Sequence, residues 1–157
     1  MAQRGGSVTA QVRYGHSVAS PLIPPGGACA IASLECIEAL RASDLLAPGG
    51  LVVANSQRIV PVTVSSGAMS YPADAEERVR RLYPGAILLD AGAIATELGN
   101  VRAANVAVMG ALSTGLPDLP PEAWEQALAA AVKPQHLELN RAAFAKGREA
   151  ALAAAAS

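Results

Sequence analysis

The residues of this chain best suited to chemistry lie in two short stretches. In Gln3-Arg4-Gly5-Gly6, two glycines let backbone N–H groups approach a ligand, and the forked guanidinium of the arginine pairs with phosphate or carboxylate. Asn105 opens an apolar stretch, where a buried amide needs hydrogen-bond partners. Both stretches are candidate contacts to a ligand or a partner. The simpler alternatives are a turn before a strand for the first, and a tie between loops after a left-handed helix cap at Asn100 for the second.

Polar residues also follow three short apolar runs. Ser33 and Glu35 end the first run, Asn55 and Ser56 end the second, and Asp90 ends the third. Ligands of open α/β sheets bind beyond the carboxyl ends of the strands, so a polar row there is what a binding crevice requires. Helix capping is the alternative; it is favoured for Asp90 and evenly balanced for Asn55.

Several catalytic arrangements are absent from the sequence. The two histidines, His16 and His136, lie far apart, and Cys29 and Cys36 do not have the spacing of a zinc or iron–sulfur site. No Gly-x-Ser-x-Gly motif and no Gly-Asp-Gly thiamine diphosphate motif occurs. We therefore expect no catalytic residue, no metal ligand and no cofactor of its own in this chain.

The composition narrows the class of protein. The chain has 157 residues, which fits one domain, and 52% of them are hydrophobic, which suffices for a core. The net charge is -1, and the only basic cluster is Arg78, Arg80 and Arg81, so nucleic acid is not an expected partner. No apolar run approaches the roughly 20 residues that span a bilayer, and no signal peptide is evident, so a cytoplasmic protein is expected without a membrane partner.

The pattern of apolar residues predicts the elements that would position these side chains. Continuous apolar runs predict strands buried on both faces, at residues 28–34, 51–54 and 86–89. Helices are expected over 35–46, 74–82, 91–98, 103–116, from 120 onward, and after 134. Alternation over 8–14, a turn at 15–16 and a return over 17–20 predict a hairpin. The sequence thus predicts an α/β, Rossmann-like layered fold with a mainly parallel sheet, an N-terminal antiparallel hairpin and a helical C-terminal part.

Five stretches, taken in order, resemble the gamma-type domain of 2-oxoacid:ferredoxin oxidoreductases, in the form found in indolepyruvate ferredoxin oxidoreductase. They are Met1–Val8, Ser20–Pro24, Glu35–Leu40 with Leu46–Gly50, Val53–Asn55 and Glu97–Asn105. Each motif is short, but their order and spacing run through roughly the whole chain.

The resemblance implies a subunit of an enzyme that oxidatively decarboxylates an aryl 2-oxoacid, such as indolepyruvate, to its acyl-CoA and reduces ferredoxin. It implies thiamine diphosphate and [4Fe-4S] clusters on a large partner subunit, and coenzyme A in the complex. Gln3, Arg4, Gly5, Gly6, Asn55 and Asn105 then become candidate coenzyme A or subunit-interface positions. A stand-alone coenzyme A- or nucleotide-binding module and a truncated, non-functional remnant are the alternatives.

One feature departs from the family pattern. Members have an N-terminal segment with a Gly-Gly-Gln-Gly motif before the Gln3–Gly6 loop, and this sequence starts after it. We therefore expect residues 1–157 to be a single gamma-type domain, either N-terminally truncated or a natural short form. Such a domain would expose an apolar sheet edge and would be poorly soluble or obligately associated.

Overall fold

A single parallel sheet lies at the centre of the part of the chain that the structure, a computed structural model, describes: residues 8–57, 72 and 74–155. Its strands are β1 (Ala28–Ser33), β2 (Leu46–Asn55) and β3 (Ile87–Leu89), arranged in the order β1-β2-β3. Val53 pairs with Ala32 on one side and with Ile87 on the other. The three apolar runs are therefore strands, as the sequence predicts.

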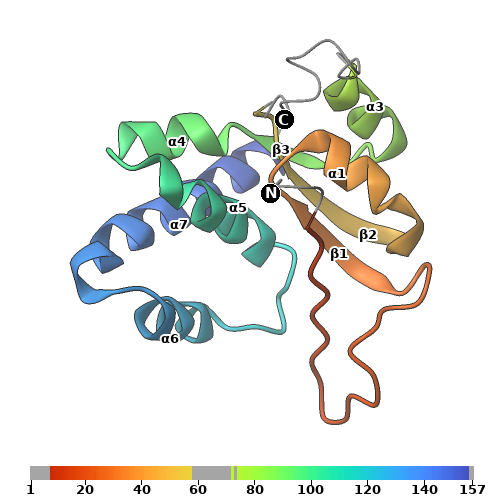
Figure 1. The fold of residues 1–157 in the computed structure, drawn as a ribbon, viewed down its shortest axis with the longest axis horizontal. Coiled ribbons are helices and arrows are strands. Elements are labelled where there is room, and N and C mark those ends of the chain that lie inside the picture. The colour runs from red at the N-terminus through yellow and green to blue at the C-terminus, as the bar shows by residue number, and fades with distance from the viewer. Residues whose placement is uncertain (1–7, 58–71, 73, 156–157) are drawn as a thin grey trace.

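Helices cover both faces of this sheet (Figure 1). One face packs against α1 (Cys36–Arg41) and α3 (Ala75–Leu82), through a buried cluster that includes Val52 and Val79. The other face packs against α5 (Ala104–Ser113) and α7 (Pro134–Ala155), through a cluster that includes Val53 and Val108. Since neighbouring residues of a strand point to opposite faces, Val52 and Val53 enter different layers of the core. The mixed α/β architecture and the helical C-terminal part are confirmed.

The helix between β1 and β2 is shorter than the sequence predicts. The helix expected over 35–46 ends at Arg41 and is followed by a short 3-10 turn, η1 (Ser43–Leu45). β2 begins already at Leu46, which pairs with Ala28, and the register then shifts so that Ala30 pairs with Leu51. Gly49, with a φ of 75°, permits the irregularity, because this backbone conformation strains any residue with a side chain.

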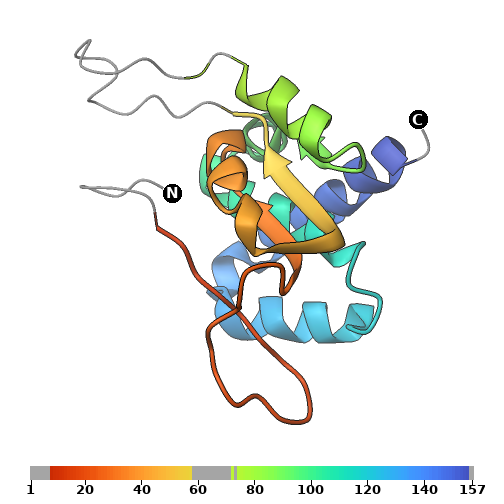
Figure 2. The ribbon, with the colours of Figure 1, turned by 90° about the vertical axis from the view of Figure 1, so that its right-hand side faces the viewer.

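The remaining helices lie in the left half of the molecule in Figure 1, with α4 at the top and α6 at the bottom. They are α4 (Ala91–Glu97), the 3-10 turn η2 (Val101–Ala103) and α6 (Pro121–Ala131), besides α5 and α7. α6 and α3 lie at opposite ends of the molecule in both Figure 1 and Figure 2. No helix in the described ranges is both long enough and apolar enough to span a membrane.

The tightest helix contact joins α5 to α7. A methyl group on Gly147 would overlap the backbone carbonyl of Ala107, and one on Gly110 would overlap that of Phe144. The two backbones therefore touch where each helix has a glycine, so neither position has room for a side chain. We call this the α5–α7 interface; its buried small residues are Ala107, Gly110, Ala111, Ala143, Gly147 and Ala151.

The predicted N-terminal hairpin is wrong, because residues 8–27 form a loop without strands. Its two arms are joined by side chains instead of a backbone ladder: the Arg13 guanidinium donates to the carbonyl of Ser20 at 2.9 Å, and Gln11 Oε1 accepts from the N–H of Ile23 at 2.6 Å. Val8 and Val12 are 64% and 77% exposed, so the alternating apolar side chains do not pack against the core. The sequence of residues 59–64 also predicts a strand, which Pro61 restricts to a sheet edge or an extended loop; these residues lie outside the described ones.

Candidate functional site

The polar residues at the carboxyl edge of the sheet hold the start of α4. Asn55, only 2% exposed, accepts a hydrogen bond from the N–H of Ala91 at 2.9 Å through Oδ1. Asp90 Oδ1 accepts from the N–H of Ala93 at 2.8 Å. These bonds satisfy N–H groups that have no partner within the helix. Capping, one of the two interpretations that the sequence allows, is therefore present at both positions.

The end of β1 is tied in a similar way. Ser33 Oγ donates to the carbonyl of Glu35 at 2.5 Å and accepts from the N–H of the same residue at 3.2 Å. The Cys36 thiol lies 3.7 Å from the carbonyl oxygen of Asn55 and links α1 to the end of β2. The predicted polar residues thus follow the three strand ends: Ser33, Glu35, Asn55 and Asp90. The side-chain oxygens of the serine, the asparagine and the aspartate form hydrogen bonds to backbone groups.

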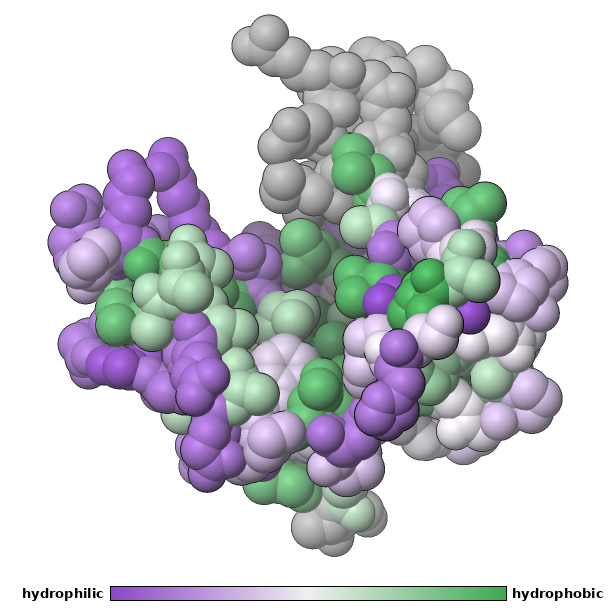
Figure 3. Space-filling model, turned by 90° about the horizontal axis from the view of Figure 1, so that it is seen from below, coloured by the Kyte–Doolittle hydropathy of each residue, from purple (hydrophilic) through white to green (hydrophobic). Residues whose placement is uncertain are grey.

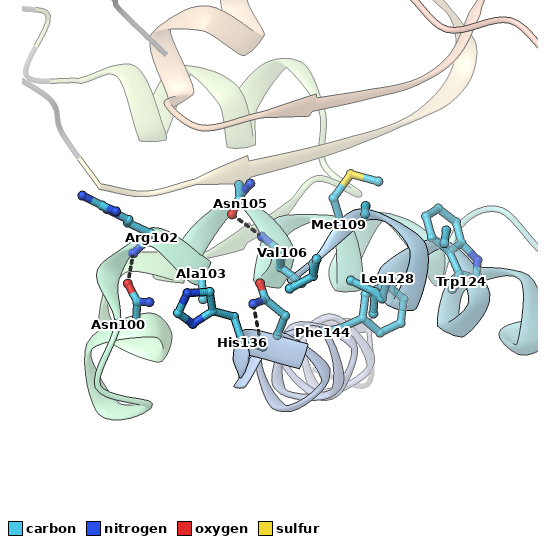
Figure 4. A pocket seen from close by; sticks show the side chains of 14 residues that line it. Asn100, Arg102, Ala103, Asn105, Val106, Met109, Trp124, Leu128, His136 and Phe144 are labelled. Atoms are coloured by element: carbon cyan, nitrogen blue, oxygen red, sulfur yellow. Dashed lines mark hydrogen bonds between the residues drawn. The ribbon is translucent and has the colours of Figure 1, made fainter. Parts of the chain in front are cut away.

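Asn105 lies in a different place, on the rim of a groove beside α5. Asn105 is exposed, and its Oδ1 accepts a hydrogen bond from the N–H of Val106 at 3.0 Å. The groove has a volume of about 630 Å³ and runs between η2 and α5 on one side and α6 and the start of α7 on the other (Figure 4). We call it the α5–α6 groove. It is lined by Asn100, Arg102, Ala103, Asn105, Val106, Met109, Trp124, Ala127, Leu128, Ala131, Val132, His136, Asn140 and Phe144.

The α5–α6 groove has a polar end and an apolar end. Figure 4 shows Asn100, Arg102 and His136 at one end, and Leu128 and Trp124 toward the other. The Trp124 ring lies 5.8 Å from the ring of Phe144, between centroids, at an angle of 39°. A pocket of this size with a mostly apolar lining and a few polar groups has the character of a binding site.

The backbone at the polar end differs from the predicted one. Gly99, not Asn100, takes the left-handed conformation, with a φ of 82°. Asn100 is extended and caps η2, its Oδ1 accepting from the N–H of Arg102 at 3.1 Å. Glycine occupies the left-handed position because it has no Cβ to clash there.

The lower side of the molecule in Figure 1, where α6 and the 8–27 loop lie, is seen in Figure 3. Apolar and polar atoms mix on this face, and its middle is hollowed. Tyr14 of the loop and Asp118, which precedes α6, form a hydrogen bond that raises the pKa of Tyr14 above its ordinary 10.0. The loop therefore comes close to the segment between α5 and α6 at Tyr14.

The predicted site residues are therefore not gathered in one place. Gln3, Arg4, Gly5 and Gly6 lie outside the described residues. Asn55 is buried at the sheet edge, whereas Asn105 is exposed at the groove. Sequence reasoning missed the groove itself. Its available signal was the four-residue spacing of Trp124, Leu128 and Val132, which indicates an apolar helix face without showing whether another element covers it.

No metal centre is found among the residues described. Nowhere in these ranges do three His, Cys, Asp or Glu side chains come together as a possible ligand set. Of the two cysteines, Cys29 is exposed and Cys36 is buried, and no disulfide joins them.

Comparison with known proteins gives a consistent result. The family model for pyruvate ferredoxin/flavodoxin oxidoreductase matches residues 1–150. The chain is 39% identical over 156 residues to indolepyruvate oxidoreductase subunit IorB of Thermococcus kodakarensis, covering 96% of this chain and 77% of that protein. It is 40% identical over 158 residues to the protein of the same name from Pyrococcus horikoshii, with coverages of 96% and 77%. The corresponding protein of Archaeoglobus fulgidus is 39% identical over 157 residues, with coverages of 97% and 77%.

Proposed function

Because this chain belongs to the pyruvate ferredoxin/flavodoxin oxidoreductase family, we propose that it is the subunit of a 2-oxoacid:ferredoxin oxidoreductase that holds no cofactor itself. The observation behind this proposal is the extent of the similarity, which runs through 96% of the chain to relatives named as oxidoreductase subunits. The names of these relatives favour indolepyruvate, an aryl 2-oxoacid, as the substrate. In the proposed reaction the carboxylate leaves as CO₂, coenzyme A takes the acyl group, and the electrons pass to ferredoxin.

In this proposal the large partner subunit holds thiamine diphosphate and the [4Fe-4S] clusters. The two cysteines of this chain do not fit a cluster: Cys36 is buried against the Asn55 carbonyl, and Cys29 is exposed on β1. Thiamine diphosphate would supply the group that attacks the oxoacid carbonyl, and this chain's own residues would shape and close the site around it. The chain alone is therefore expected to be inactive.

The candidate contacts divide into two roles. Asn105 remains a candidate for direct contact with coenzyme A or with the partner subunit because it is exposed, and the Gln3–Gly6 stretch remains one on its sequence alone. Asn55 is better suited to positioning, because its Oδ1 is engaged with the N–H of Ala91 and the residue is 2% exposed. The proposal also takes residues 1–157 as one gamma-type domain and places the complex in the cytoplasm.

Reconstitution with the large subunit from the same organism tests the proposal. Dye reduction that depends on both indolepyruvate and coenzyme A is expected when the two chains are combined, and not with either chain alone. Equal activity of the large subunit by itself would contradict the proposed role. Pyruvate serves as the comparison substrate, and a higher kcat/KM for pyruvate than for indolepyruvate would overturn the aryl specificity while leaving the enzyme class in place.

A further inference from the structure

Helix α6 presents an apolar face that the chain itself leaves partly uncovered. None of its side chains, all of which the structure describes, is fully buried. Trp124 and Leu128 lie one turn apart and are half-buried, and both line the α5–α6 groove. Opposite them, Met109 of α5 is 40% exposed. An amphipathic helix normally packs its apolar stripe against another element, so this groove has the character of an incomplete interface.

The charges of the groove specify what would complement it. Arg102 is the one permanently charged residue of its described lining, which contains no carboxylate. Within the described ranges Arg102 forms no ion pair. The other polar lining residues are three amides, Asn100, Asn105 and Asn140, and one imidazole, His136. A guanidinium that has no carboxylate partner pairs well with a carboxylate of an incoming chain.

The Trp124 side chain gives a second, independent indication that the groove is an incomplete interface. Its Nε1 is buried and has no hydrogen-bond acceptor among the described residues. A buried donor without an acceptor destabilises the free protein, and a docked segment toward which the indole ring turns would remove that penalty by supplying an acceptor. Tryptophan and arginine are also the residues most enriched among the energetic centres of protein interfaces.

We propose that the α5–α6 groove binds a segment of the large partner subunit whose apolar side chains cover Trp124 and Leu128 and whose carboxylate pairs with Arg102. This inference rests on the proposed function, because that function supplies the partner. The binding mode is that of an apolar segment laid in a groove between helices, with a charged pair at one end.

The experiment uses the single tryptophan of the chain as a reporter. The full chain is labelled with 5-fluorotryptophan, and the fluorine resonance is recorded before and after addition of the unlabelled large subunit. We expect the Trp124 resonance to shift on complex formation. Leu128→Glu should weaken the complex by roughly tenfold or more, as the loss of an interface anchor does. The matched control is Leu82→Glu at the end of α3, where Leu82 is 54% exposed and far from the groove; it should leave the affinity unchanged.

A charge series tests the polar end. Arg102→Glu should weaken the complex, Arg102→Lys should recover most of the affinity, and Arg81→Glu on α3 should have no effect. Each variant is compared at a temperature well below its own melting transition, where its circular dichroism matches that of the parent chain. An unshifted Trp124 resonance in a formed complex, or wild-type affinity for both Leu128→Glu and Arg102→Glu, would overturn this inference and leave the proposed function standing. Failure of the wild-type chain to bind the large subunit would overturn both.

Discussion

Helix α7 packs on two of its neighbours, α5 and α6, in opposite ways. Along the α5–α7 interface, Gly147 and Gly110 bring the two backbones into contact, and Ala143 and Ala151 are buried. Near its start, α7 lies beside α6, and the α5–α6 groove between them stays open. An ion pair between Arg141 of α7 and Glu125 of α6 joins the two helices. The first contact is complete within the chain. The second leaves Trp124 and Leu128 half-buried, so apolar surface stays uncovered by the described residues.

The largest effect is expected where the two backbones touch. Gly147→Ala places a methyl group against the carbonyl of Ala107, so the helices must separate, and the free energy of unfolding should fall by about 3 kcal/mol. Gly85→Ala is the control, because a Cβ at Gly85 meets nothing within 4 Å. Urea denaturation of both variants checks this. Equal stability of the two variants would mean that the α5–α7 interface is looser than described.

A pair of truncations compares the two regions directly. Val108 is 3% exposed in the core beside the α5–α7 interface, whereas Leu128 in the α5–α6 groove is only half-buried. Val108→Ala should therefore lower the unfolding free energy by about 2 kcal/mol and Leu128→Ala by about 1 kcal/mol or less, although the leucine loses more atoms. The same denaturation series measures both. The reverse order would show that α6 is part of the core.

Substitution of the two candidate asparagines, Asn55 and Asn105, should give a smaller difference in stability. Asn55→Ala leaves the N–H of Ala91 without its acceptor, and should cost about 1.5 kcal/mol of stability. Asn105→Ala on the groove rim should change stability by less than about 0.5 kcal/mol, because the residue is exposed. Thermal melting of the free chain compares them. A large loss with Asn105→Ala would assign that residue a structural role and remove it from the proposed interface.

The smallest effect concerns pH. The hydrogen bond to Asp118 and the nearby negative charge raise the pKa of Tyr14, so the neutral phenol is the form that the folded state favours. The stabilisation that this contact gives is therefore fully present below pH 10.0, and it is lost as the pH rises through the raised pKa. The phenolate absorbance of the wild type minus that of Tyr14→Phe isolates this titration. Asp118→Asn should move it to lower pH, and Glu77→Gln on α3 should not; a titration that Asp118→Asn leaves in place would contradict the contact.

The sheet is the part of the fold that the sequence predicts best. Val52 and Val53 belong to a run with no polar position, which indicates a strand covered on both faces. The start of β2 at Leu46 was not predictable, because it depends on pairing with Ala28, which lies distant in sequence. The N-terminal alternation around Val12 failed as a prediction because no neighbouring strand gives it a face to pack on.

The candidate site was predictable only in part. The residues after the strands meet at one edge of the sheet because parallel strands end there, and Asn55 lies where that argument places it. The α5–α6 groove depends on how three helices are placed relative to one another. The spacing of Trp124 and Leu128 predicts an apolar stripe, but it contains no information on whether that stripe is covered.

Backbone hydrogen exchange, measured on the free chain and on its complex with the large subunit, tests the central claim most directly. In the free chain, amides of α6 should exchange faster than those of α5 and α7 at the α5–α7 interface, because few buried contacts hold α6 in place. In the complex, residues 101–106 and 121–131 should gain protection, while residues 107–113 and 143–151 should change little. If α6 exchanges equally in both samples while the complex forms, the partner binds elsewhere and the claim is wrong.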